Sequence, residues 1–189
     1  MNWRNLLALA TLCILVQPIL SQEKTEKKDG PAKVEMLELA KGRVVVAKPE
    51  TWKTMPPPNQ MIDKEFRFPA EGEAFARITV SQASGGIEPN IARWIGQFDG
   101  ATKENSKIEK KDVDQTKVHL VEIEGTFKES MGPMVPGAAT KKKENYKMLS
   151  AILELKDGSL IFIKTTGPKD IVANMREEFV KMIDGLKNK

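Results

Sequence analysis

Apolar and polar positions along the first half of the chain alternate in the manner of strands. Residues 43–46 form a β-branched run, residues 65–68 alternate strictly between polar and aromatic, and every second residue of 74–80 is apolar. A period of two is typical of a strand with one buried face. Three consecutive prolines at 56–58 remove three backbone donors and cannot belong to a central strand. The pattern predicts antiparallel strands separated by an irregular segment.

The spacing then changes to that of a helix. Apolar residues recur along one helical face at Ile87, Ile91, Trp94, Ile95 and Phe98. Pro89 lies early, where a missing N–H costs nothing, and Gly100 lies just past the end. These features predict an amphipathic helix over 87–98 that packs on a core. Trp94 is interpreted as a packing residue, with a ligand platform as the alternative.

Two hairpins are predicted in the second half. The polar turn at 114–116 separates strand-like segments 107–113 and 117–128. Asp157-Gly158 separates 148–155 from 160–165, which are both dense in apolar residues. Asp-Gly between apolar runs is the strongest short-range hairpin signal. We expect this second hairpin near the middle of the sheet.

The last segment predicts a helix that closes the core. Gly167-Pro168 precedes it, and Asp170 falls in its first turn. Its apolar face consists of Ile171, Met175, Phe179, Met182, Ile183 and Leu186. Because strands occur in runs and only two helices are predicted, the expected class is α+β, an antiparallel sheet with two main amphipathic helices packed against it.

Residues 1–21 have the pattern of a secretory signal peptide. Arg4 gives a positive start, 6–16 is an apolar run, and a more polar exit predicts cleavage after Ser21 or Gln22. The run is shorter than the about 20 residues of a spanning helix, so an uncleaved anchor is the second interpretation. We therefore expect export to the periplasm or the outside, with no stable membrane insertion after cleavage.

Cys13 is the only cysteine, and it lies inside this apolar run. Lipid attachment is the alternative interpretation, but Leu12 precedes Cys13 where lipoprotein processing requires a small residue. The mature protein is expected to hold no thiol. Residues 22–33 are charged and lack apolar periodicity, which predicts a flexible linker before a single domain at 34–189.

The charge balance adds little about partners. The chain has 30 basic and 26 acidic residues, and the removal of residues 1–21 takes away one base and no acid. Lys and Glu alternate along most of the sequence, which is typical of a solvated surface and not of a phosphate-binding face. Export argues further against nucleic acid as a partner.

Candidate catalytic and metal-binding groups are sparse. His119 is the only histidine, and the mature chain offers no cysteine ligand. Glu122 and Glu124 share a strand face without the loop of an EF-hand, so a solvated edge is preferred to calcium binding. His119 is interpreted as a hydrogen-bonded structural residue, with a general base as the alternative. No G-x-S-x-G, S-x-x-K, Walker A or G-x-G-x-x-G motif occurs, so no catalytic residue, metal or cofactor is assigned.

The segment Glu129–Asn145 is predicted as a long loop between two strands, and such loops often carry function. It contains the candidate partner-contact residues Met131, Met134, Val135, Lys141, Lys142 and Lys143. Exposed apolar residues suit protein contacts, and the lysine run could steer an acidic partner. The alternative is a disordered excursion whose lysines only increase solubility.

Four segments together resemble a known group of proteins: KPETW at 48–52, NIARWIGQF at 90–98, GTF at 125–127 and KTTGP at 164–168. They resemble secreted proteins of unknown role from planctomycete-type bacteria. The order of elements is similar to the wider Mog1/PsbP-like class, which includes the periplasmic DcrB-like proteins. The resemblance covers about residues 34–186 and implies an antiparallel sheet with helices packed against it. It implies no reaction and no functional residue, and the chain lacks the lipoprotein cysteine of lipid-anchored relatives.

Three functions remain open from the sequence. The first is an exported, non-enzymatic binding or accessory protein of the cell envelope, with a protein or small-molecule partner. The second is an enzyme with an unrecognised site, for which a deep pocket joining His119 to a carboxylate would be the discriminating feature. The third is a structural protein anchored by an uncleaved N-terminal helix.

Overall fold

A computed structural model describes residues 34–131 and 139–189. The predicted signal peptide, the predicted linker and the candidate contact residues Met134 and Val135 lie outside the described residues. No helix within the described ranges is long and apolar enough to cross a membrane. The strands are β1 (Met36–Leu39), β2 (Val44–Ala47), β3 (Lys53–Met55), β4 (Lys64–Phe68), β5 (Ala76–Ala83), β6 (Phe98–Asp99), β7 (Lys107–Val113), β8 (Thr116–Ser130), β9 (Thr140–Glu154), β10 (Leu160–Pro168) and β11 (Lys187–Asn188), and the helices are α1 (Ile87–Ile95), α2 (Lys169–Asn174) and α3 (Arg176–Asp184).

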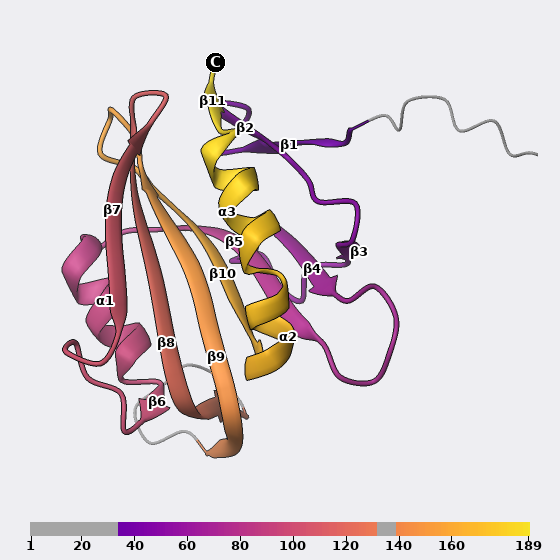
Figure 1. Ribbon diagram of the computed structural model, residues 1–189. Coiled ribbons are helices and arrows are strands. Elements are labelled where there is room, and N and C mark those ends of the chain that lie inside the picture. The colour runs from indigo at the N-terminus through magenta and orange to yellow at the C-terminus, as the bar shows by residue number, and fades with distance from the viewer. Residues whose placement is uncertain (1–33, 132–138) are drawn as a thin grey trace, which may run out of the picture. The chain divides into compact units, whose positions relative to one another are not determined.

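One large antiparallel sheet forms the centre of the domain (Figure 1). Its strand order is β3-β4-β5-β10-β9-β8-β6, and β7 pairs with β8. Both predicted hairpins are confirmed, β7-β8 around Asp114 and Gln115, and β9-β10 around Asp157-Gly158. Asp114 and Gln115 both have positive φ, as a tight two-residue hairpin turn requires. The β9-β10 hairpin lies in the interior of the sheet, as expected.

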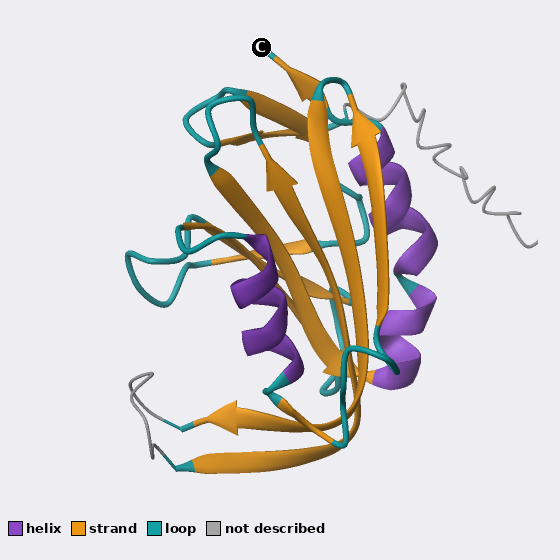
Figure 2. Ribbon diagram, turned by 90° about the vertical axis from the view of Figure 1, so that its left-hand side faces the viewer, coloured by secondary structure: helices purple, strands orange, loops and turns teal. Residues whose placement is uncertain are grey.

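Helices cover the large sheet on both faces (Figure 2). One core joins alternate strand residues such as Leu120 and Ile163 to α2 and α3, and the other joins their neighbours, such as Val121 and Phe162, to α1. Burial on both faces explains why β8 carries apolar residues at successive positions, which hid its orientation in the sequence. The α+β class with two helical packing units is confirmed.

A second, three-stranded sheet has the order β1-β2-β11. The end of the chain pairs with β2, and the Lys189 N–H donates to the Arg43 carbonyl at 3.0 Å. Val44 and Val46 of β2 point into the same core as Phe179 of α3. This small sheet therefore packs on the α2-α3 side of the domain (Figure 1).

The terminal helix differs from the prediction in one detail. It is divided into α2 and α3 at Met175, which is fully buried with φ −88° and ψ −3°. The Met175 carbonyl still accepts from the Phe179 N–H at 3.0 Å, so the axis continues and one apolar face is kept. Phe179 has no exposed surface, as expected from its central position on that face. The first helix also ends earlier than predicted, at Ile95, and Phe98 starts β6.

The predicted long loop at Glu129–Asn145 is wrong in its bounds. β8 continues to Ser130 and β9 begins at Thr140, so both ends of the segment belong to strands. The lysine-rich part of the segment pairs with residues 127–130 of β8. The sequence did not indicate this strand, because lysine has a low β-propensity.

Candidate functional site

The first candidate site is an extension of the sheet formed by β8 and β9, here called the β8–β9 ribbon, residues 126–130 and 140–145. The short strand β6 pairs with its base at Thr126 and Phe127. β10 pairs with β9 only from Tyr146 onward, so the ribbon extends past the end of β10. Both strands bend where their register shifts, between Gly125 and Phe127 of β8 (Figure 2). Gly125 has φ 150°, and a Cβ there would lie 2.8 Å from the Asp99 carbonyl oxygen. The bend in β8 therefore requires glycine at position 125.

The ribbon is attached to the segment that follows α1. The Lys128 N–H donates to the Gln97 carbonyl at 2.8 Å, and the Asp99 carboxylate pairs with Lys142 at 2.8 Å and Lys128 at 3.2 Å. Phe127 packs on Phe98, with ring centroids 5.1 Å apart. Since an isolated two-stranded hairpin is only marginally stable, these contacts hold the ribbon in place.

The described candidate contact residues fall at the outer end of the ribbon. Met131 is 63% exposed, and Lys141 and Lys142 are exposed on β9. Hydrogen bonding to Asp99 raises the pKa of Lys142, and Lys143 pairs with Glu129 at 3.6 Å. Two of the three lysines therefore have intramolecular carboxylate partners, which reduces the charge available to steer a partner.

The second candidate site centres on Lys164, in the middle of β10. Its Nζ atom donates to Gln97 Oε1 at 2.6 Å and lies 6.0 Å from the ring centroids of both Trp94 and Phe127. No carboxylate of the described residues lies within 4.0 Å of this ammonium. The Lys164 residue is partly exposed, and desolvation acts strongly on its ammonium.

Lys164 lies beside two further cations. Burial first, and then the positive charges of Arg93 and Arg77, lower the pKa of Lys164 to about 7. Arg93 donates to the side-chain oxygen of Asn90 at 2.6 Å and is exposed on α1. Arg77 forms two bonds to Glu65, at 3.0 and 2.6 Å. Of these three cations, Arg77 alone has a carboxylate partner among the described residues.

A denser charged cluster on the opposite face has a structural role. Glu122 accepts from Lys147 Nζ at 2.7 Å and from Arg176 Nε at 2.8 Å, which ties α3 to the sheet. Burial alone would raise the pKa of Glu122, but these two hydrogen bonds outweigh it, and the pKa is lowered. Glu124 pairs with Lys147 at 3.2 Å and with Lys169 at 2.6 Å. The carboxylates are paired with bases, and within the described residues no group of three acids, histidines or cysteines could hold a metal.

His119 and Ser150 do not form a catalytic arrangement in the described residues. His119 is buried, and its pKa is lowered by burial first and then by Lys110. The expected hydrogen bond is missing at Nδ1, which has no partner within the described part of the chain. Ser150 lies opposite Lys164 in the β9-β10 ladder, yet its buried Oγ also lacks a partner there, so no Ser-Lys pair is formed.

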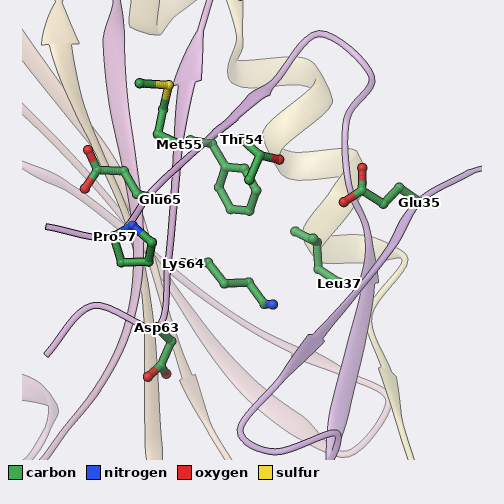
Figure 3. A pocket seen from close by; sticks show the side chains of 9 residues that line it. Glu35, Leu37, Thr54, Met55, Pro57, Asp63, Lys64 and Glu65 are labelled. Carbon is green, nitrogen blue, oxygen red and sulfur yellow. The ribbon is translucent and has the colours of Figure 1, made fainter. Parts of the chain in front are cut away.

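A pocket of about 220 Å³ lies between β1, β3 and β4 (Figure 3). Its lining residues are Glu35, Leu37, Thr54, Met55, Pro57, Asp63, Lys64, Glu65 and Phe66. Pockets for drug-sized ligands are usually about 300 Å³ or larger. Neither His119 nor Lys164 lines this pocket. This pocket is therefore not the one that would favour an enzyme, which would join His119 to a carboxylate.

Comparisons with known proteins support the fold. No protein-family model matches the chain, and no curated protein matches it. The solution structure of the cyanobacterial PsbP, CyanoP, from Synechocystis sp. PCC 6803 is similar, with a TM-score of 0.53 and 13% identity over 85% of this chain and 95% of that one. A Pseudomonas aeruginosa protein of unknown function, PA94, has a TM-score of 0.44 and 12% identity over 82% of this chain and 97% of its own. The CyanoP likeness shows that the chain has a Mog1/PsbP-like α+β fold.

Sequence reasoning missed Lys164, Arg77 and Arg93 as a group. One signal was present in the sequence Leu-Ile-Phe-Ile-Lys at 160–164. Lys164 follows Leu160 and Phe162, both buried, on the same face of a central strand. A charge at such a position needs a partner or a function. The proximity of Arg77 and Arg93 could not be read from the sequence, because β5 and α1 are far from β10 along the chain.

Proposed function

We propose that this protein is an exported, non-enzymatic binding or accessory protein of the cell envelope, of the kind that planctomycete-type bacteria secrete, and that it contacts a protein partner through the outer end of the β8–β9 ribbon. The observation that carries the proposal is the exposure of Met131 at the end of a strand pair that extends past the sheet and is held in a fixed direction. Methionine is a side chain that adapts to many apolar surfaces. Exposed apolar residues on positioned elements are common at protein contacts.

Two further observations support a binding role. Both faces of the sheet are covered by helices, so contacts must use edges, helices or extensions. Edge strand β7 carries Lys107, Lys110 and Lys111, and charged edges discourage strand addition. The ribbon is the extension that remains, and its end combines Met131 with the exposed lysines 141 and 142.

Site-specific crosslinking tests this proposal. With a photo-crosslinking amino acid in place of Met131, we expect one adduct of discrete mass, recovered in the envelope or periplasmic fraction of the producing cells. Met61 is the matched control, because it is also methionine and is 72% exposed, but it lies between β3 and β4. Position 61 is expected to give no such adduct.

The outcome that would contradict the proposal is equally specific. If position 131 gives no adduct, or if positions 61 and 131 give the same set of adducts, the ribbon is not the contact surface. An adduct recovered only from the cytoplasmic fraction would contradict export.

A further inference from the structure

Lys147 and Lys164 have opposite surroundings, and the contrast indicates an incomplete site. Lys147 Nζ bonds to Glu122 at 2.7 Å and to Glu124 at 3.2 Å. These carboxylates outweigh burial and raise the pKa of Lys147. Lys164 has a neutral amide oxygen as its acceptor, at 2.6 Å. One of its three ammonium donors is thus satisfied by the described residues, and its charge is not balanced.

The aromatic neighbours of Lys164 do not replace a counter-ion. The ring centroids of Trp94 and Phe127 are 6.0 Å from Nζ, at the outer limit of a cation–π contact. A buried, protonated amine without an anion is costly. The group must therefore lose its proton or acquire an anion from outside the described structure.

The surroundings favour an external anion. Arg93 precedes Gln97, the hydrogen-bond acceptor of Lys164, by four residues, and Arg77 pairs in register with Thr166, two residues from Lys164 on β10. Both arginines act on Lys164 as positive charges. Glu65 is the carboxylate that pairs with Arg77, and the contact of Arg93 within the described residues is the neutral Asn90 oxygen. Three cations thus share one acid in this part of the structure. Arg93 is exposed and Lys164 is partly exposed, so a small ion can reach them from solvent.

We propose that Lys164 and Arg93, supported by Arg77, form a binding site for an oxyanion, the carboxylate or the tetrahedral sulfate-like or phosphate-like group of a ligand. The guanidinium of Arg93 offers a planar donor pair, and the ammonium of Lys164 supplies a point charge in a region of low dielectric. Binding there would satisfy the remaining donors of Lys164 and hold it protonated. This site involves none of the ribbon contact residues, so it stands independently of the proposed protein contact.

Sulfate titration of the purified full chain, monitored by isothermal titration calorimetry, tests the site, because this readout also works in variants that lack Lys164. Sulfate keeps its charge over the pH range used. Because only the protonated amine attracts the ion, and the pKa of Lys164 is about 7, the apparent affinity for sulfate is expected to be about tenfold weaker at pH 8 than at pH 6. A parallel acetate titration shows whether a planar carboxylate or a tetrahedral group binds better.

Four variants assign the effect. Lys164→Met is expected to weaken sulfate binding at least tenfold, and Arg93→Gln to weaken it less. Lys164→Arg is expected to keep binding but lose its pH dependence, since arginine stays charged. This variant retains His119, the only histidine, so the loss assigns the titration to Lys164. Lys103→Met removes a charge that pairs with Glu88, near the other end of α1, and is expected to change nothing.

Two results would overturn the inference. Sulfate and acetate affinities that are the same in the wild-type protein and in Lys164→Met would exclude the site. A wild-type affinity that does not change between pH 6 and pH 8 would exclude the role of the Lys164 ammonium. If Lys164→Met does not fold, the comparison of Lys164→Arg with wild type gives the same decision, because a pH dependence retained in Lys164→Arg contradicts the proposal.

Discussion

Replacing Gly167 with alanine is expected to destabilise the protein by about 3 kcal/mol, because the new methyl group has no space. A Cβ at position 167 would lie 2.6 Å from the Ala76 Cα and 2.8 Å from the Ala76 Cβ. Backbone atoms of β5 form the obstacle, so the two central strands must separate to relieve the overlap. The free energy of unfolding from chemical denaturation measures the effect.

Gly96→Ala is the matched control. A Cβ there would lie 3.5 Å from the Ala92 carbonyl oxygen, an ordinary contact, and Gly96 has helical φ of −60°. Removing glycine at a compatible position usually stabilises by about 0.4 to 1 kcal/mol. If Gly167→Ala costs no more than Gly96→Ala, the close approach of β10 and β5 is not as described.

Phe179→Ala is expected to cost about 3 to 5 kcal/mol, as does the loss of a fully buried phenylalanine in other cores. Phe179 is 0% exposed on α3, and its ring centroid lies 6.3 Å from that of Trp52. Trp52 is itself fixed by a 2.9 Å hydrogen bond from its Nε1 to Glu178 Oε1. Phe179 thus joins the terminal helix to the segment that enters β3. Small domains have about 5 to 15 kcal/mol of stability in total, so unfolding should occur at much lower denaturant concentrations.

Lys181→Ala is the control on the same helix. Lys181 is exposed, and alanine is a good helix former, so the change should stay within about 0.5 kcal/mol. A loss below about 1 kcal/mol for Phe179→Ala would mean that the terminal helix does not close the core.

Local sequence patterns predicted those strands and helices that are determined by neighbouring residues in the chain. The hairpin at Asp157-Gly158 and the helical stripe that includes Phe179 both followed from spacing and turn residues, and the structure confirms them. The continuation of β8 and β9 into the ribbon did not, because the strands there are stabilised by pairing with each other and by Asp99, and lysine-rich segments have low β-propensity. Burial of the sheet on both faces also removed the alternation that orients β8.

The candidate sites were predictable only in part. Met131 was identified because it is an apolar residue in a polar, glycine- and proline-rich segment, and in the structure its side chain is exposed to solvent. Lys164 stood in an apolar strand, which is a local signal, but its meaning depends on what surrounds the ammonium. Gln97, Arg93 and Arg77 come from other elements, and single-sequence reasoning has no means to place them beside β10.

The pKa of the Lys164 amine in a buffer that contains no oxyanion is the measurement that most directly tests the central claim, that this domain holds a desolvated cation without a counter-ion of its own. Selective ¹³C labelling of lysine allows its titration to be followed by NMR and assigned by its loss in Lys164→Arg. A pKa near 7 is expected, rising when sulfate is added, whereas Lys147 should remain protonated beyond the ordinary lysine range. A pKa for Lys164 at the ordinary value of about 10.4, unchanged by sulfate, would contradict the claim.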